Sequence, residues 1–176
     1  MQSPFEETGL EELTVLIVDD NRHFRKVARN LLRALKISRI YEAEDARSAL
    51  DALKSDAIDL IMTGLVMKPV SGIKLAEGIR KSDGKPYQKV PIIGMTLYSS
   101  FETIVKARDA GVNEILAKPL SARQLERHIR GLIEDNRDFI KGGSFIGPDR
   151  RRHKGMRYEG PERRADEPIG WSGTSS

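Results

Sequence analysis

The hydrophobic positions of the chain fall into short runs that end in polar residues. Four of these runs are almost wholly apolar, and each is followed closely by a carboxylate, a glycine, a hydroxyl or a lysine. Consecutive apolar side chains are typical of strands that are covered on both faces, as in a parallel sheet. We therefore predict strands over residues 15–18, 58–62, 90–93 and 112–116, with a weaker fifth strand over residues 39–43.

The segments between these runs have the 3.6-residue spacing of amphipathic helices. Asp45 and Ser121 are suited to helix N-caps, and Gly111 is placed to end the fourth helix. Five strands that alternate with five helices over short links predict an α/β fold, a doubly wound five-stranded parallel sheet. The expected helices lie near residues 24–35, 46–53, 73–79, 104–107 and 125–133.

The patterned part does not extend over the whole chain of 176 residues. We predict a flexible lead over residues 1–12, one folded domain over residues 13–140, and a disordered basic tail over residues 141–176. The tail has eight Lys or Arg against five Asp or Glu, so it carries +3 of the net charge of +4. A nucleic-acid groove on the folded part is therefore not expected, and nucleic acid is an unlikely partner there.

A short repeat lies in this tail. Gly-Pro-Asp-Arg-Arg at residues 147–151 returns as Gly-Pro-Glu-Arg-Arg at residues 160–164. Each unit joins a turn-forming Gly-Pro to an arginine pair, which suits a partner with acidic or phosphate-bearing pockets. The alternative is a solubilising tail with chance similarity. If the units dock, the partner-binding residues are Arg150, Arg151, Arg163 and Arg164.

Composition excludes several kinds of site. The absence of cysteine rules out disulfides, thiolate catalysis and cysteine zinc sites, and the three histidines have no ligand spacing. No apolar run of about 18 residues and no secretory signal is present, so we expect no membrane span and a cytoplasmic protein.

Residues that could take part in chemistry or bind a ligand follow the predicted strands. Asp19 and Asp20 follow the first strand, Gly64 the third, Thr96 the fourth and Lys118 the fifth. The carboxyl ends of the strands in such a fold meet at one edge, where ligands bind. An acid pair, a hydroxyl and Lys-Pro in this order resemble the receiver domain of a bacterial two-component response regulator. The resemblance implies the (βα)5 flavodoxin-like receiver fold.

The resemblance also implies a phosphoryl-transfer site. In the receiver family a carboxylate at the end of the third strand takes a phosphoryl group from a phosphohistidine on a partner kinase, and charge neutralisation supports the transfer. Asp19, Asp20 and the backbone carbonyl of Val66 would hold Mg²⁺. Lys118 would pair with the acidic cluster and the phosphoryl oxygens, and Thr96 would hydrogen-bond to the phosphate.

The nucleophile of that site is missing. Its position, eight residues before the family's loop glycine (here Gly72), is occupied by Gly64. Glycine has no carboxylate to attack phosphorus, so transfer by the family route fails and Mg²⁺ binding is weakened. Thr63 and Ser71 are poor substitutes, because Thr63 points to the opposite face of its strand and Ser71 lies in a loop.

Two explanations of Gly64 are open. The chain is either a natural degenerate receiver that signals by binding alone, or a receiver whose acceptor Asp was replaced to hold it unphosphorylated. The retained acid pair, threonine and lysine favour the second. The switch also departs from the family, since Ile115 stands where an aromatic is usual, and Tyr98 is a substitute aromatic candidate.

We interpret the chain as a stand-alone, single-domain response regulator of a phosphorelay, locked unphosphorylated, and not as an enzyme. It would act through protein contacts on the face of the fourth helix and fifth strand, with Tyr98 and Ile115 as partner-binding residues. Its partners would be a histidine kinase or phosphotransfer protein and a downstream target. The alternatives are a phosphorylation-independent pseudo-receiver and an adaptor that binds nucleic acid or acidic surfaces through the tail.

Overall fold

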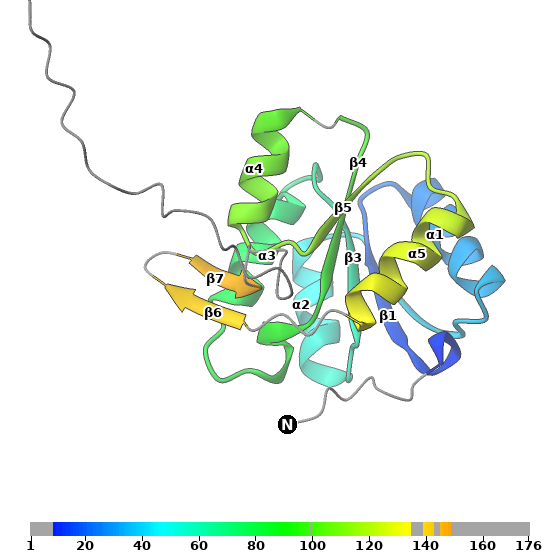
Figure 1. Cartoon of the computed structure of the whole chain (residues 1–176), viewed down its shortest axis with the longest axis horizontal. Coiled ribbons are helices and arrows are strands. Elements are labelled where there is room, and N and C mark those ends of the chain that lie inside the picture. The colour runs from blue at the N-terminus through cyan, green and yellow to red at the C-terminus, as the bar shows by residue number, and fades with distance from the viewer. Residues whose placement is uncertain (1–8, 99, 135–138, 143–144, 149–176) are drawn as a thin grey trace, which may run out of the picture.

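The chain folds into a five-stranded parallel sheet with helices on both faces (Figure 1). This computed structural model describes residues 9–98, 100–134, 139–142 and 145–148. The strand order is β2-β1-β3-β4-β5, which confirms the predicted doubly wound sheet. The strands are β1 (Thr14–Val18), β2 (Arg39–Ala43), β3 (Leu60–Gly64), β4 (Ile92–Thr96) and β5 (Glu114–Ala117).

Two apolar layers separate the sheet from its helices. One layer lies under α1 (Arg22–Ala34) and α5 (Ala122–Ile133). The other lies under α2 (Ala46–Ser55), α3 (Gly72–Arg80) and α4 (Phe101–Asp109). Successive strand residues alternate between the layers, so that Leu16 packs on the α2–α4 side and Ile17 on the α1–α5 side. Two short 3-10 helices, η1 (Leu10–Glu12) and η2 (Pro86–Lys89), complete the elements of the domain.

The predicted helix caps are confirmed, although α1, α4 and α5 begin two or three residues earlier than the apolar spacing indicated. The Asp45 carboxylate accepts from the backbone N–H of Ser48 at 2.8 Å and caps α2. The Ser121 hydroxyl accepts from the N–H of Gln124 at 3.3 Å and caps α5. Gly111 has a φ of 92° just after α4, a left-handed conformation that glycine adopts at no steric cost.

Three strands begin two residues later than predicted, at Leu60, Ile92 and Glu114. Before β3, the Asp59 carboxylate accepts from the N–H of Thr14 at 2.8 Å, so this residue reaches β1 through its side chain. Before β4, Pro91 has no N–H to give to a ladder. β3 and β4 also end later than predicted, so Gly64 and Thr96 are the last residues of their strands.

The ends of the domain differ from the sequence expectation. Leu10, assigned to the flexible lead, is buried with the α1–α5 layer. Two antiparallel strands, β6 (Phe139–Gly142) and β7 (Phe145–Pro148), lie where a structureless tail was predicted from residue 141. The missed signal is a Gly-Ser pair between two Phe-Ile segments, which is typical of a two-residue hairpin turn. The four tail arginines lie outside the described residues.

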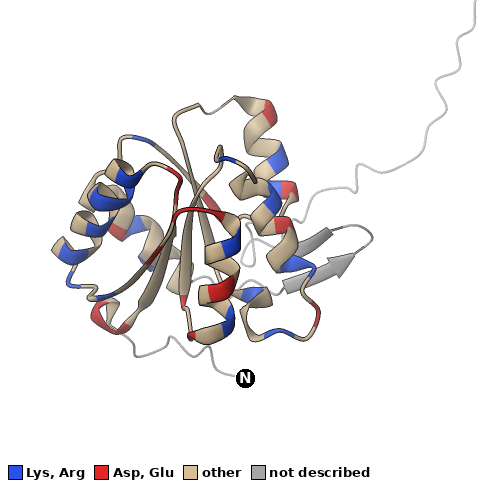
Figure 2. Cartoon of the chain, turned by 180° about the vertical axis from the view of Figure 1, so that it is seen from behind, with Lys and Arg blue, Asp and Glu red and all other residues tan. Residues whose placement is uncertain are grey.

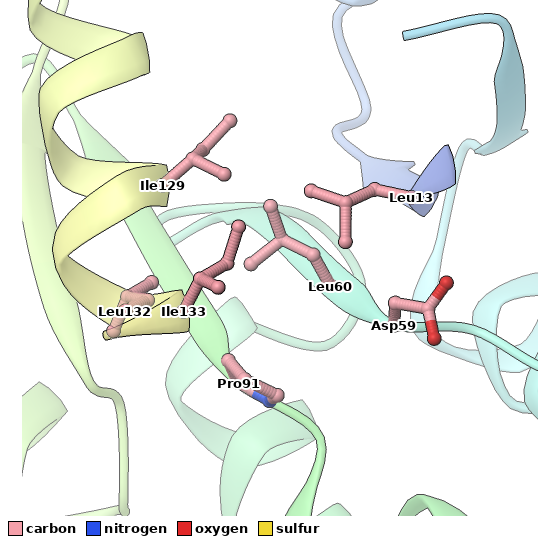
Figure 3. Close-up of a pocket in the computed structure, with 7 residues that line it drawn as sticks. All are labelled: Leu13, Asp59, Leu60, Pro91, Ile129, Leu132 and Ile133. Atoms are coloured by element: carbon pink, nitrogen blue, oxygen red, sulfur yellow. The ribbon is translucent and has the colours of Figure 1, made fainter. Parts of the chain in front are cut away.

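The amino-terminal edge of the sheet carries a small apolar hollow, away from the predicted site (Figure 3). Its one acidic residue, Asp59, already bonds to the backbone of Thr14. The hollow is lined by Leu13, Asp59, Leu60, Pro91, Ile129, Leu132 and Ile133. Within the described part of the chain, no helix is long and apolar enough to cross a membrane.

Candidate functional site

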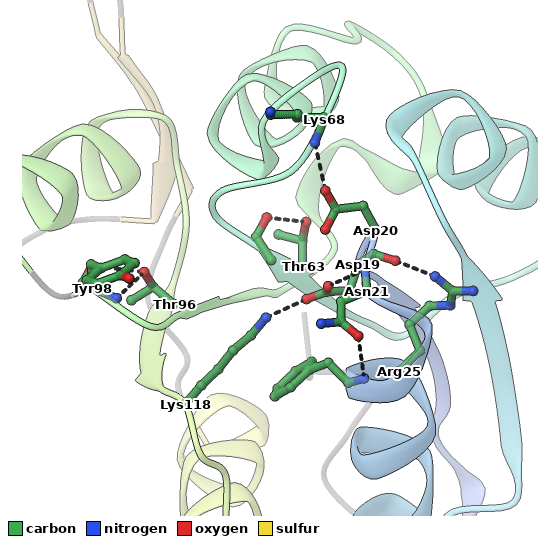
Figure 4. A network of polar contacts seen from close by, with 11 residues as sticks. Asp19, Asp20, Asn21, Arg25, Thr63, Lys68, Thr96, Tyr98 and Lys118 are labelled. Atoms are coloured by element: carbon green, nitrogen blue, oxygen red, sulfur yellow. Dashed lines mark hydrogen bonds and ion pairs between the residues drawn. The ribbon is translucent and has the colours of Figure 1, made fainter.

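The carboxyl ends of the strands bring the predicted site residues to one edge of the sheet (Figure 4). Asp19 follows β1, and its N–H donates to the carbonyl of Ala43 on the neighbouring strand at 3.1 Å. Lys118 follows β5, and its N–H donates to the carbonyl of Thr96 at 2.8 Å. These backbone bonds extend the sheet beyond its last ladder pairs and point both side chains into the space above Gly64.

An ion pair occupies the centre of the site. The Lys118 Nζ lies 2.7 Å from the Asp19 Oδ2, and their side chains are only 12% and 2% exposed. The other oxygen of Asp19, Oδ1, accepts from the N–H of Asn21 at 2.9 Å. The ammonium group also lies 3.7 Å from the centroid of the Phe24 ring. A buried carboxylate is costly without a partner, and here both of its oxygens are satisfied.

Gly64 gives this ion pair its space. A Cβ built on Gly64 would lie 2.7 Å from the Asp19 Oδ2 and 3.2 Å from the Cγ of Met67. Both distances are shorter than ordinary van der Waals contact, so any side chain at this position must displace the Asp19 carboxylate. The Asp19 carboxylate thus occupies the space where a larger residue 64 would begin.

The second acid has a different environment. Asp20 is exposed, and its Oδ2 accepts from the N–H of Lys68 at 3.0 Å. This bond ties the loop after β3 to the loop after β1. Val66, whose carbonyl was the third expected metal ligand, is 72% exposed in the same loop.

The donor set does not fit a divalent cation in this arrangement. Mg²⁺ needs oxygen ligands in near-octahedral geometry. Asp19 is neutralised by an ammonium, Gly64 offers no side chain, and the described residues contain no group of three His, Cys, Asp or Glu that could hold a metal. The chemistry left to the site is charge pairing between its own residues.

Thr96 turns toward its own loop. Its hydroxyl donates to the carbonyl of Tyr98 at 2.8 Å and accepts from the N–H of the same residue at 3.1 Å. The Tyr98 side chain is 74% exposed and does not pack inward. Ile115 is half-buried and packs against the α2–α4 layer. Ile115 is thus an aliphatic side chain at the position where the resemblance implies an aromatic one.

The alternative acceptors are engaged elsewhere. Thr63 is fully buried, and its hydroxyl donates to the carbonyl of Gly64 at 3.2 Å. The Ser71 hydroxyl accepts from the N–H of Lys74 at 3.3 Å and caps α3. Gly72 passes so close to Gly64 that any Cβ on it would collide with the Gly64 carbonyl oxygen. The Thr63 hydroxyl is therefore closed off from a phosphoryl donor, and the Ser71 hydroxyl serves as a helix cap.

The sequence analysis missed two neighbours of the central ion pair. Phe24 appeared only as an apolar helix position, although its ring lies against the Lys118 ammonium. Asn21 caps α1 by accepting from the N–H of Phe24 at 3.2 Å, and its own N–H binds Asp19. An Asn between an acid pair and an amphipathic period is a recognisable N-cap signal.

Comparison with known proteins decides the family. The model of the response regulator receiver domain matches residues 15–130. This chain belongs to the response regulator receiver family. The chemotaxis protein CheY-3 of Vibrio cholerae is 32% identical to this receiver over 124 residues, which cover 70% of the chain and 94% of the relative. CheY of Pseudomonas aeruginosa is 32% identical over 122 residues, which cover 69% and 97%.

Solved structures agree on the fold. Chemotaxis response regulator CheY4 of Vibrio cholerae superimposes with a TM-score of 0.61 at 24% identity, covering 67% of this chain and 96% of that one. The receiver domain of a sensor histidine kinase from Pseudomonas aeruginosa gives a TM-score of 0.63 at 24% identity, covering 70% and 98%. That protein is described with a magnesium ion in its active-site cleft, which is a property of that receiver.

Proposed function

We propose that this receiver acts in phosphorelay signalling through protein contacts, without carrying a phosphoryl group at position 64. Its partners would be a histidine kinase or phosphotransfer protein on one side and a downstream target protein on the other. Its role would be binding and not catalysis. The observation that carries the proposal is Gly64, which leaves the end of β3 without a nucleophile.

The packing around Gly64 accommodates the glycine without a cavity-filling side chain at this position. The Asp19 oxygen lies where the first carbon of an acceptor side chain would have to pass. Because that oxygen is the end of a side chain that can rotate, this packing suits both a natural phosphorylation-independent receiver and a receiver whose acceptor was replaced. Sequencing the native gene at codon 64 separates the two explanations.

An exposed apolar surface supports signalling by contact. It comprises Leu97, Tyr98, Phe101 and Ile104, here called the β4–α4 patch, with exposed fractions of 68%, 74%, 83% and 37%. Large apolar side chains gathered on a surface are typical of protein-binding sites. The patch lies directly after Thr96, so it adjoins the site edge.

The first test is phosphorylation. The parent protein, Gly64→Asp and Gly64→Asn are incubated with acetyl phosphate and Mg²⁺, and acid-labile phosphate is measured. We expect phosphate only on Gly64→Asp, because Asn has the shape of Asp without a nucleophilic carboxylate. Stoichiometric phosphate on the parent would contradict the proposal.

The second test is partner binding. A partner recovered from the host with the parent protein is titrated against Leu97→Ser/Phe101→Ser and against Val70→Ser. Val70 is 38% exposed outside the patch and serves as the matched control. We expect the patch variant to lose affinity at least about tenfold, since exposed apolar anchors often carry interface energy. Equal affinities for all three proteins would exclude the patch.

A basic helix favours a second candidate function, contact with a nucleic-acid backbone. α1 carries five Lys or Arg and no acid, although residues 1–140 as a whole carry a net charge of only +1. Figure 2 shows the resulting blue bands on the helices at its left. Such binding would weaken steeply with added salt, whereas binding through the β4–α4 patch would persist. A salt titration of each partner complex therefore separates the two functions.

A further inference from the structure

We infer that Lys118 is the built-in counter-ion of the acid pair, so that its ammonium group takes the place of a divalent metal and the folded site is independent of Mg²⁺. The inference rests on the proposed phosphorylation-independent function, because only a site that carries out no transfer can dispense with the metal. It concerns a different measurement, metal affinity, and can fail separately.

The position of the ammonium group is the first argument. Its nitrogen lies 2.7 Å from the Asp19 Oδ2, a short, charge-assisted contact. Lys118 is only 12% exposed, so the pair is poorly screened by water. A metal at Asp19 would have to break this contact and place a second cation beside the first.

The number of free oxygens is the second argument. One oxygen of the Asp19 carboxylate accepts from the Lys118 ammonium, and the other accepts from the N–H of Asn21. Asp20 gives one oxygen to the N–H of Lys68. With Gly64 contributing no charge, two carboxylates and one ammonium leave a net charge of only −1. A third carboxylate would have left −2, which a divalent ion neutralises better.

The aromatic ring of Phe24 is the third argument. Its face lies 3.7 Å from the Lys118 nitrogen and comes from α1, a different element from either member of the ion pair. A cation over an aromatic face is attracted by the ring quadrupole, more strongly where water is excluded. Lys118 is thus held from two sides. The Thr96 hydroxyl is bonded to Tyr98 and does not compete for Lys118.

The test is a Mg²⁺ titration at constant ionic strength, followed by the NMR shifts of the backbone amides of Asp20, Val66 and Lys68. The parent is compared with Lys118→Met, which keeps a long unbranched side chain and removes the charge. It is also compared with Lys118→Arg, which keeps the charge. Lys106→Met is the matched control, because Lys106 pairs with Glu102 on exposed α4. Thermal melts verify that each variant is folded.

We expect Lys118→Met to bind Mg²⁺ at least about tenfold more tightly than the parent, since a nearby positive charge is gone. Lys118→Arg and Lys106→Met should bind as weakly as the parent. Phe24→Leu should gain affinity by a smaller factor, because it loosens only one of the two contacts of Lys118.

Equal Mg²⁺ affinities of the parent and Lys118→Met would overturn the inference. If Lys118→Met does not fold, the parent and Phe24→Leu still test the inference. Site-specific saturation of the parent by Mg²⁺ in the micromolar range would overturn the inference. Absence of saturation up to millimolar Mg²⁺ in the parent, together with a gain of affinity in Phe24→Leu, would support it. Phosphate on the parent would refute the proposed function, whereas the Mg²⁺ titration would still report the metal affinity of the site. A parent that binds neither Mg²⁺ nor a protein partner would also refute the proposed function, while its weak Mg²⁺ binding would still agree with the inference.

Discussion

The Asp19 carboxylate of this receiver lies against the backbone of Gly64, with its Oδ2 only 2.7 Å from where a Cβ of residue 64 would stand. The same oxygen accepts the ammonium of Lys118. The absence of a side chain at residue 64 therefore leaves the space in which the Asp19 carboxylate meets the Lys118 ammonium. Five predictions concern this packing, the buried Arg80 and the hairpin of β6 and β7.

Gly64→Ala should lower the free energy of unfolding by about 1 kcal/mol, because its methyl group displaces Asp19 and weakens a buried ion pair. Part of the cost is offset, since alanine restricts the unfolded chain more than glycine does. Gly78→Ala is the control. Gly78 lies in α3 with nothing within 4 Å of a built Cβ, so this change should stabilise the protein by about 0.5–1 kcal/mol. Urea unfolding measures both; stabilisation of equal size in both variants would show that Asp19 moves at no cost.

Gly64→Asp should melt at a lower temperature than the parent in chelator, because a third carboxylate repels Asp19 and competes for Lys118. Added Mg²⁺ should raise its melting temperature more than that of the parent, since the new carboxylate restores negative charge. Gly64→Asn has nearly the same volume without the charge and separates crowding from repulsion. A Gly64→Asp variant that is more stable than the parent in chelator would mean that the entropy of the glycine dominates.

Arg80→Met should destabilise the domain by about 3 kcal/mol, because Arg80 is 1% exposed and its loss leaves buried acceptors unpaired. The guanidinium donates to the carbonyls of Gly111, Gln88 and Val90 and to the Asn113 side chain, so it joins α3 to the start of β4 and β5. Arg130→Met removes an exposed pair with Glu126 and should cost less than about 0.5 kcal/mol. Chemical unfolding of both variants measures the difference.

The pH dependence of the Arg80 effect has a definite sign. Burial lowers the pKa of Arg80 to about 9, from an ordinary 12.5. Below pH 9 both the folded and the unfolded chain hold this proton, so the cost of Arg80→Met should be constant from neutral pH upward to there. Above pH 9 the unfolded chain binds more protons than the folded one, so stability from this group rises with pH. A cost that already changes between pH 7 and pH 8 would contradict this assignment.

Ending the chain at residue 138 should leave the melting temperature of the receiver unchanged. β6 and β7 pair with each other in a separate two-stranded sheet and take no part in the ladders of β1 to β5. An isolated two-stranded hairpin adds little stability in water. Ending the chain at residue 148 is the control that keeps the hairpin. A lower melting temperature of the shorter protein alone would show that the hairpin braces the domain.

The sequence by itself determined the architecture. Short runs of consecutive apolar residues are typical of strands buried on both faces of a parallel sheet, and the helical periods between them supply the cover for those faces. The caps at Asp45 and Ser121 were also readable, because a side chain reaches a backbone group only three residues away. The gathering of Asp19, Gly64 and Lys118 followed from the common direction of the strands.

Only the tertiary structure decided which partner each site residue takes. Lys118 and Asp19 are 99 residues apart, and whether they meet depends on a few ångströms of loop geometry and on the ring of Phe24. Spacing along the chain could not show that Thr96 bonds to Tyr98 or that Asp19 fills the space at Gly64. The common direction of the strands follows from the alternation of strands and helices along the chain. The pairing of side chains depends instead on distances of a few ångströms that only the complete fold determines.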